Sequence, residues 1–277
     1  MHTKRIVVGY DGSDGARAAL AWGVDHAEGR ELDVLVVVTL MDPLVGGFRE
    51  ADEREGAQHR DEAVRALQDA ALPDARVQVV HGPTSETLID RTGPGDVLVV
   101  GSRGHGVATG ALLGSVSQHL AHHARCPVVA ARPARNPEER RIGVGLDGSS
   151  ASLEALRWAC DLASTTDERV VAVHGFYARR HGPGSEVSTA EALNREIAQH
   201  EQDLAAWVEQ AGPLPESVQV DREVVAVPGK QALVDLSERA SLVVVGSHGH
   251  RPVAEMLLGS VGQHVLHHAH CPVAVVR

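Results

Sequence analysis

The sequence has few aromatic residues, few cysteines and no long apolar run. Phe, Trp and Tyr make up 3% of the 277 residues, and the formal net charge is −11. It shows no basic stripe and no basic patch rich in aromatics, which argues against nucleic acid as a partner. No apolar run approaches membrane-spanning length, and the first residues show no signal-peptide pattern. We therefore expect a soluble cytoplasmic protein without a membrane partner.

Cysteine is too rare for a disulfide framework. The chain has 3 cysteines, and Cys126 and Cys271 each precede a proline. Free Cys is among the most buried residue types. We expect buried, reduced thiols.

Motifs of common hydrolytic sites are missing as well. The chain has no G-x4-G-K-[ST] phosphate loop, no G-x-S-x-G nucleophile elbow and no H-E-x-x-H metal helix. Fast enzymatic turnover is therefore not expected.

The chain does contain an internal duplication. VGYDGS at 8–13 returns as VGLDGS at 144–149, and HHARCPV at 122–128 returns as HHAHCPV at 267–273. A repeat of this length indicates whole domains rather than a solenoid.

A polar stretch at 132–140, which contains two prolines, separates the two copies. We therefore predict one domain at residues 1–135 and a second at 136–277. Each is long enough to form its own core.

Within each copy, short β-branched runs alternate with longer helical patterns. Runs such as VLVVV at 34–38 are apolar throughout, which is typical of parallel strands covered on both faces. We predict an α/β fold of two tandem doubly wound domains, each with a five-stranded parallel sheet. The strands expected in the first copy are 5–10, 32–40, 76–81, 96–101 and 127–131, and the helices are 15–27, 52–71, 85–91 and 115–124.

Glycines recur at one spacing in both copies. They are Gly101, Gly104 and Gly114 in the first copy, and Gly246, Gly249 and Gly259 in the second. Glycine lets a backbone approach a ligand closely, and a helix N-terminus offers free amides to an anion. We interpret each set as a phosphate cradle; the alternative is a turn that serves only the fold.

In this interpretation Ser115 is the N-cap of the next helix, and the amides of Val116 and Ser117 face the anion. Asp11 and Asp147 end the first strand of each copy. Each either contacts the ligand or caps the following helix, and one carboxylate can do both.

The glycine pattern G-x2-G-x9-G-[ST], the Asp that ends the first strand and the helix leading to CPV together resemble the ATP-binding branch of the universal stress protein family. The resemblance covers the whole chain as a tandem pair. It implies the sheet order 3-2-1-4-5 and ATP, or another adenine nucleotide, in each site. It also implies pairing between domains through the final strands, and a homodimer. We expect a regulatory protein partner that reads the nucleotide-bound state during stress.

The resemblance assigns Asp11 to the adenine or ribose end and the backbone near Leu40 to the base. Ribose and phosphates fall to the three glycines of the first copy with Ser115, Val116 and Ser117. The matching residues in the second copy are Asp147, Gly175, Gly246, Gly249, Gly259, Ser260 and Val261. Gly262 stands where the first copy has Ser117, so a phosphate-facing hydroxyl would be missing and weaker binding is expected there.

Two functional hypotheses follow. In the first, nucleotide occupancy controls the conformation or assembly of a regulatory protein. In the second, the protein slowly hydrolyses ATP or transfers phosphate, with Arg103, His105 and a Mg²⁺ ion as the candidates for charge compensation. Arg103 either reaches a phosphate or is an exposed loop arginine.

Other residues suggest more ordinary roles. The charged stretch at 52–62 is expected to be an exposed helix face that confers solubility, and Trp22 and Trp158 are expected in the core. The trios His119, His122, His123 and His264, His267, His268 each share one helical face. They either bind a metal or form a solvated or packing surface.

Overall fold

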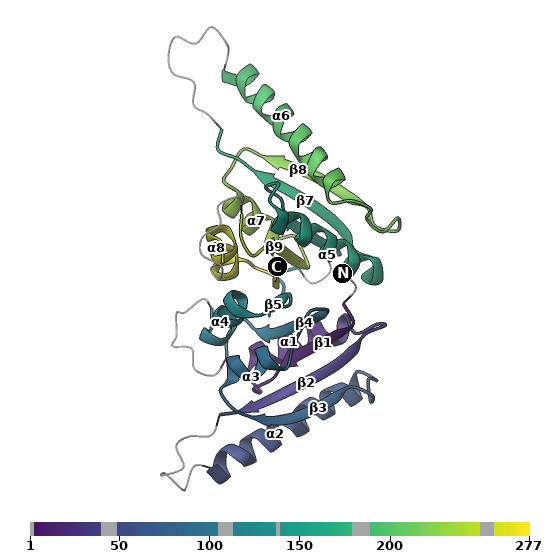
Figure 1. Cartoon of the computed structure of the whole chain (residues 1–277), viewed down its shortest axis with the longest axis vertical. Helices are drawn as coiled ribbons and strands as arrows, with labels where there is room; N and C mark the ends of the chain where they lie inside the picture. The colour runs from purple at the N-terminus through teal and green to yellow at the C-terminus, as the bar shows by residue number, and fades with distance from the viewer. Residues whose placement is uncertain (1–2, 40–48, 105–112, 137–138, 179–188, 250–257) are drawn as a thin grey trace. The chain divides into compact units, whose positions relative to one another are not determined.

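The computed structural model describes residues 3–39, 49–104, 113–136, 139–178, 189–249 and 258–277. The chain divides into two compact units, Met1–Pro133 and Ala134–Arg277. Each unit has the same arrangement of strands and helices (Figure 1).

The first unit contains a parallel sheet in the order β3-β2-β1-β4-β5. This order and the alternation of strands and helices confirm the prediction, with ends that differ by a few residues. The elements are β1 (Arg5–Gly9), α1 (Asp14–Asp25), β2 (Glu31–Val38), α2 (Arg49–Asp69), β3 (Arg76–His81), α3 (Thr84–Asp90), β4 (Asp96–Gly101), α4 (Ser115–His123) and β5 (Val128–Ala131).

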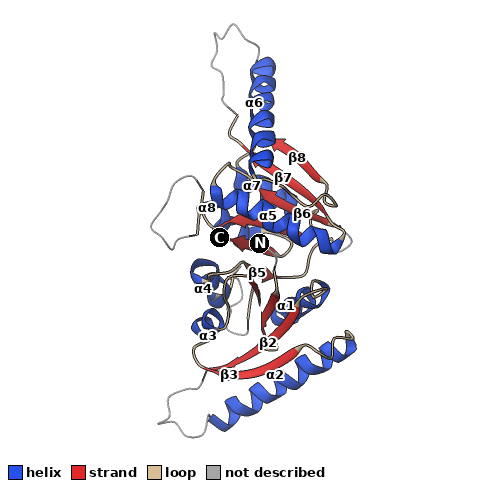
Figure 2. Ribbon diagram, turned by 45° about the vertical axis from the view of Figure 1, so that its right-hand side comes forward, coloured by secondary structure: helices blue, strands red, loops and turns tan. Residues whose placement is uncertain are grey.

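Strand β1 lies at the centre of this sheet. Val8 pairs with Val34 of β2 on one side and with Val99 of β4 on the other. Helices α1 and α2 cover one face, and α3 and α4 cover the other (Figure 2). The apolar strands are buried because both faces are covered. Connections leave β1 and β4 toward opposite faces, and a crevice at such a point is where α/β sheets bind ligands.

The second unit repeats this arrangement with the order β10-β9-β6-β7-β8. Its elements are β6 (Arg141–Gly145), α5 (Ser150–Thr166), β7 (Arg169–Gly175), α6 (Thr189–Gln210), β8 (Val220–Val225), α7 (Gly229–Ser237), β9 (Leu242–Gly246), α8 (Ser260–His268) and β10 (Val273–Val276).

The predictions for the core are confirmed. Trp22 on α1 and Trp158 on α5 are buried, with 7% and 4% of their surface exposed. Cys126, Cys160 and Cys271 are free and buried. Burial raises the pKa of Cys160 to about 12, which makes its thiol a poor nucleophile at neutral pH.

At the amino ends of the strands, Arg5 ties three parts of the first unit together. Its guanidinium contacts Asp96 Oδ2 at 2.7 Å and Asp33 Oδ2 at 3.1 Å, and it donates to the carbonyl of Arg91. The Asp33 side chain is only 6% exposed, and Arg76 Nε lies 3.8 Å from its other oxygen.

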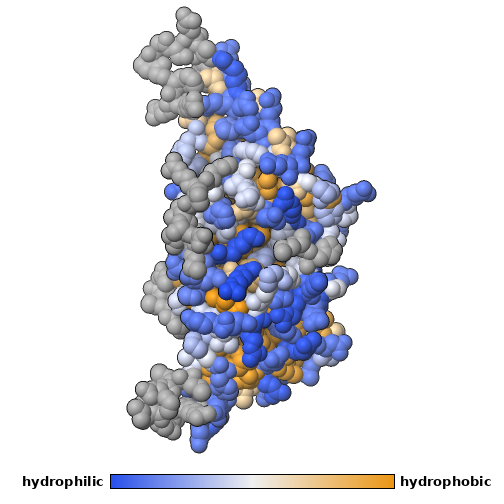
Figure 3. Space-filling model, viewed as in Figure 1, coloured by the Kyte–Doolittle hydropathy of each residue, from blue (hydrophilic) through white to orange (hydrophobic). Residues whose placement is uncertain are grey.

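The visible face of the protein is mostly hydrophilic (Figure 3). Among the described residues, the exposed large apolar side chains are Tyr177 and Val261. None of the described helices combines the length and apolar character that crossing a membrane requires.

Candidate functional site

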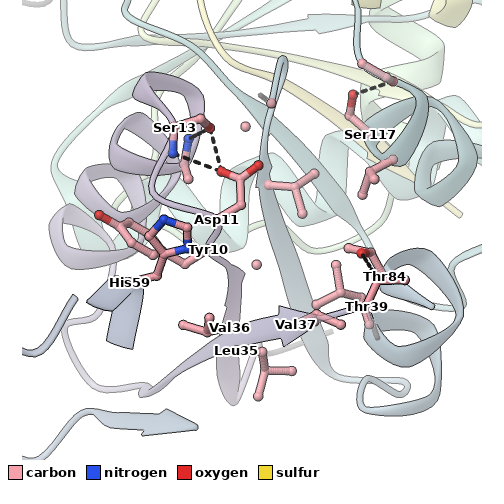
Figure 4. A pocket seen from close by; sticks show the side chains of 18 of the residues that line it. Tyr10, Asp11, Ser13, Leu35, Val36, Val37, Thr39, His59, Thr84 and Ser117 are labelled. Carbon is pink, nitrogen blue, oxygen red and sulfur yellow. Dashed lines mark hydrogen bonds between the residues drawn. The ribbon is translucent and has the colours of Figure 1, made fainter. Parts of the chain in front are cut away.

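A pocket of about 680 Å³ lies in the first unit at the carboxyl ends of β1, β2 and β4. Its walls come from the turn after β1, the end of β2, one face of α2 and the beginning of α4 (Figure 4). This volume is within the range that small-molecule sites occupy. The pocket brings together the first-copy residues that the sequence predicted for the site, apart from Leu40, which lies outside the described residues.

Asp11 lines this pocket, and its carboxylate holds the turn after β1 in place. Its Oδ1 accepts hydrogen bonds from the backbone N of Ser13 at 3.0 Å and from Ser13 Oγ at 2.6 Å. Ser13 Oγ in turn accepts from the backbone N of Ala16 at 3.1 Å and is the N-cap of α1. The prediction that Asp11 itself caps α1 is therefore wrong. Ser13 is the cap, and the Asp11 carboxylate holds Ser13 in place.

Gly104 leaves room for the second oxygen of this carboxylate. A β-carbon at residue 104 would lie 2.8 Å from Asp11 Oδ2, closer than such atoms approach in proteins. In the second unit, a β-carbon at Gly249 would lie 2.7 Å from Asp147 Oδ2. Glycine is therefore required at both positions by contacts within the protein, because the loop passes close to the carboxylate.

Gly101, at the end of β4, has a different cause. A β-carbon there would lie 2.5 Å from the carbonyl carbon of Gly15, in the first turn of α1. In the second unit, a β-carbon on Gly246 would lie 2.7 Å from the carbonyl carbon of Ala151. Backbone packs directly on backbone at both positions, so a side chain would separate helix from sheet.

Gly114 and Gly259 differ from the other glycines. Gly114 has a φ of −78°, which any residue adopts. A β-carbon there would lie 3.5 Å from Ser102 O, and one on Gly259 would lie 3.5 Å from His248 Cα, both ordinary contacts. Packing and backbone conformation therefore do not require glycine at these two positions.

Gly114 is the N-cap of α4, and Ser115 is the first helical residue. The prediction that Ser115 is the cap is wrong, because Gly114 already accepts the first intrahelical bond, from Gln118 N at 3.1 Å. The amides of Ser115, Val116 and Ser117 belong to the first turn, whose N–H groups have no acceptor within a helix. These residues line the pocket, so the beginning of α4 presents donors to it.

The hydroxyl of Ser117, a residue that lines the pocket, forms a hydrogen bond within the protein. Ser117 is buried, and its Oγ donates to the carbonyl of Gly114 at 3.0 Å (Figure 4). At the matching position in the second unit, a β-carbon on Gly262 would lie 2.8 Å from Leu258 Cδ1. Gly262 is thus explained by packing against Leu258.

The end of β2 supplies an apolar floor. Val36, Val37 and Val38 line the pocket, followed by Thr39, whose hydroxyl lies 3.2 Å from Thr84 Oγ1. Arg103 also lines the pocket and is exposed, whereas His105 is outside the described residues.

Sequence reasoning missed the contribution of α2. Asp52, Glu55, Gly56 and His59 all line the pocket, so the prediction that the stretch at 52–62 serves solubility alone is wrong for this face. Their spacing of three, four and seven residues places them on one side of the helix. Gly56, which packs against Val38, was the signal in the sequence that this side approaches β2.

The second unit has rings where the first has valines. Register with the central strand makes His174 the counterpart of Val36, because Leu35 pairs with Gly9 and Val173 pairs with Gly145. His174 lies 5.0 Å from His200 and 4.9 Å from Trp207, and His200 lies 4.1 Å from Phe176, between ring centroids. The two units therefore offer different surroundings to a ligand.

Gly175, which the family resemblance assigned to the base, is required by packing within the second unit. A β-carbon on it would lie 2.7 Å from Val227 O. The glycine thus allows the end of β7 to pack on the backbone before α7. Ser260 and Val261 begin α8, with Gly259 as its N-cap.

The histidine trios lie in the last turns of α4 and α8. The rings of His119 and His123 are 4.4 Å apart, as are those of His264 and His268. Burial lowers the pKa of His264, and neighbouring cations, His268 first, lower it further. Among the described residues, no group of three or more His, Cys, Asp or Glu is arranged to hold a metal.

Comparison with known proteins gives a consistent result. The model of the "Universal stress protein family" matches residues 2–132 and 139–277. Universal stress protein Rv2623 of Mycobacterium tuberculosis is 33% identical over 290 residues, which cover 98% of this chain and 96% of that protein. Universal stress protein Rv2005c of the same organism is 33% identical over 296 residues, with the same coverage.

Among solved structures, a universal stress protein from Archaeoglobus fulgidus covers 100% of this chain with a TM-score of 0.70 and 19% identity. At this identity, the likeness shows the fold alone.

Proposed function

The chain belongs to the universal stress protein family, and we propose that it is a regulatory protein whose conformation or assembly responds to ATP bound in the pocket of the first unit. The observation that carries this proposal is the pocket itself, in which Asp11, an apolar floor on β2 and the beginning of α4 face one space. A nucleotide needs these three surroundings, which are polar for ribose, apolar for the base and rich in N–H donors for phosphate.

The glycines support this proposal selectively. Packing accounts for Gly101 and Gly104, whereas neither packing nor φ requires glycine at 114. A phosphate that approaches the first turn of α4 would supply the missing reason. Gly259, in the second unit, supports a second site by the same argument.

The first experiment identifies the nucleotide released when the purified protein is denatured, and it then measures ATP binding by titration calorimetry. We expect ATP in the released fraction and little ADP. Released ADP would favour the hydrolytic hypothesis. An empty protein that also fails to bind added ATP would contradict the proposal.

The matched variants are Gly114→Ala and Gly93→Ala. Both accept a β-carbon, since the nearest atom at 114 is 3.5 Å away and none lies within 4 Å at 93. We expect Gly114→Ala to weaken ATP binding at the first site at least tenfold and Gly93→Ala to leave it unchanged. Gly101→Ala is a poorer test, because it would disturb the fold. Equal affinities for both variants would mean that the ligand does not approach residue 114.

A further inference from the structure

Asp52 is the least expected side chain in the pocket. Its Oδ2 atom is buried and has no hydrogen-bond partner within the protein, although the residue lies in the first turns of a highly charged helix. A buried carboxylate oxygen without a donor is costly. Such an atom in a ligand pocket indicates that the ligand supplies the donor.

The order of the strands indicates which part of a bound nucleotide would face Asp52. The beginning of α4 follows β4, Asp11 follows β1, and Asp52 lies on the helix that packs over β2 and β3. Because the sheet order is β2-β1-β4, these three groups follow one another across the pocket. A nucleotide with its phosphates at α4 therefore has its ribose near Asp11 and its base over β2.

The position of Asp52 along α2 agrees with this order. Gly56, one turn later, packs on Val38 at the end of β2, since a β-carbon there would lie 2.5 Å from Val38 Cγ2. His59, a further turn along, contacts Gly12 in the turn after β1. Asp52 is thus the member of this helix face farthest from the turn that holds Asp11.

We propose that Asp52 determines base specificity in this pocket, by accepting a hydrogen bond from an exocyclic amino group on the base. The inference rests on the proposed function, ATP bound in this pocket, and adds the residue that selects its base. A base with a carbonyl at the same edge would place two acceptors against each other, which leaves both unsatisfied.

ATP and ITP test the proposal, because their bases differ at this edge by an amino group in place of a carbonyl. We expect the protein to bind ATP at least tenfold more tightly than ITP, the range for a hydrogen bond to a charged group. Asp52→Asn should reduce this preference to about twofold or less, because a carboxamide can donate as well as accept. Asp52→Ala should lower ATP affinity and leave ITP affinity equal or higher, because it removes the partner of the amino group and, for ITP, the opposing acceptor. All titrations use the Gly259→Ala background, in which the second unit contributes least.

Glu55→Gln is the matched control. It removes the same charge from the same pocket-lining face of α2, but Glu55 is exposed. Loss of a negative charge should strengthen the binding of both nucleotides alike, so the ATP to ITP ratio should stay as in the parent protein. A ratio that falls equally in Asp52→Asn and Glu55→Gln would overturn the proposal.

A third nucleotide distinguishes a contact of Asp52 with the base from a contact with the ribose. We expect 2′-deoxy-ATP to show the same sensitivity to Asp52→Asn as ATP. If Asp52→Asn changed the preference for ATP over 2′-deoxy-ATP and left the preference over ITP intact, Asp52 would contact the ribose and the proposal would be wrong.

Stability without ligand gives an independent measurement. Because the Oδ2 atom is buried without a donor, Asp52→Asn should unfold at a higher temperature than the parent protein in the absence of nucleotide. Failure of every form to bind ATP would overturn the proposed function and this inference together. Normal ATP binding with an unchanged ATP to ITP ratio in folded Asp52→Asn would overturn this inference alone.

Discussion

The Oδ2 atom of Asp11 lies 2.8 Å from the position that a β-carbon on Gly104 would occupy. The same carboxylate holds Ser13, which caps α1. The glycine loop after β4 and the turn after β1 are thus fitted to each other before any ligand is considered. The second unit repeats the relationship with Gly249 and Asp147.

This relationship predicts a cost for a side chain at residue 104. Gly104→Ala should lower the free energy of unfolding by about 1 to 3 kcal/mol, because either Asp11 or the loop must move. Urea denaturation monitored by circular dichroism measures the change. Gly93→Ala is the control, since no atom lies within 4 Å of a β-carbon there. Equal stabilities of the two variants would contradict the proposed fit.

Arg5 provides a prediction at the opposite end of the strands. Arg5→Met should destabilise the first unit by about 1 to 3 kcal/mol, because it removes the closer of the two guanidinium groups at the buried Asp33 carboxylate and leaves Arg76 at 3.8 Å. Arg54→Met is the comparison, since Arg54 forms an exposed pair with Glu50 at 3.0 Å and should change stability by less than about 0.5 kcal/mol. Chemical denaturation of both variants tests the difference.

His174 predicts a pH dependence in the second unit. Burial, opposed in part by its hydrogen bond to the carbonyl of Leu146, lowers the pKa of His174. The unfolded chain therefore takes up this proton at higher pH than the folded protein. The contribution of neutral His174 to the free energy of unfolding is therefore fully present above the unfolded-state pKa of about 6.5, and it is lost as the pH falls below that value.

His174→Val, which installs the residue that the first unit has at position 36, should reduce this loss of stability between pH 7.5 and 5.5. Urea denaturation of the parent protein and the variant at both pH values measures how much the substitution changes the pH dependence of the free energy of unfolding. His81→Val, which replaces an exposed histidine, controls for the general effect of exchanging a histidine for valine on a strand. An equal pH dependence in the parent and in His174→Val would refute the assignment.

The thiol of Cys160 should resist modification in the folded protein. Its surface is 0% exposed and burial raises its pKa to about 12, so little thiolate exists at pH 8. Labelling with iodoacetamide, followed by peptide mass analysis, should show modification of Cys160 only in urea. Rapid labelling of this residue in the native protein would contradict the structure.

Local sequence pattern was sufficient for the architecture. Apolar runs such as that of β2 separated by helical patterns predict parallel strands covered on both faces, and the internal duplication predicts two such units. The buried Trp22 and Trp158 follow from the same periodicity. These features depend on neighbours within a few residues along the chain, so they can be recognised without knowing what lies across the fold.

The glycines show where the sequence alone stops being informative. Their equal spacing suggested one common role, but the structure gives Gly101 and Gly104 separate packing causes and leaves Gly114 without one. In the same way, the hydrogen bond from the Ser117 hydroxyl to Gly114 was not evident from the sequence. Each role depends on an atom brought close by folding, and such contacts have no fixed signature along the chain.

The sequence by itself determined the sheet, the duplication and the edge of the sheet at which a site would form. Only the tertiary structure decided that Asp52 lines the pocket half-buried, with its Oδ2 atom covered, because this depends on how α2 packs on β2 through Gly56. A charged residue on an amphipathic helix is exposed by default. The partial burial of Asp52 results from the packing of α2 against β2, a long-range contact that helical periodicity does not encode.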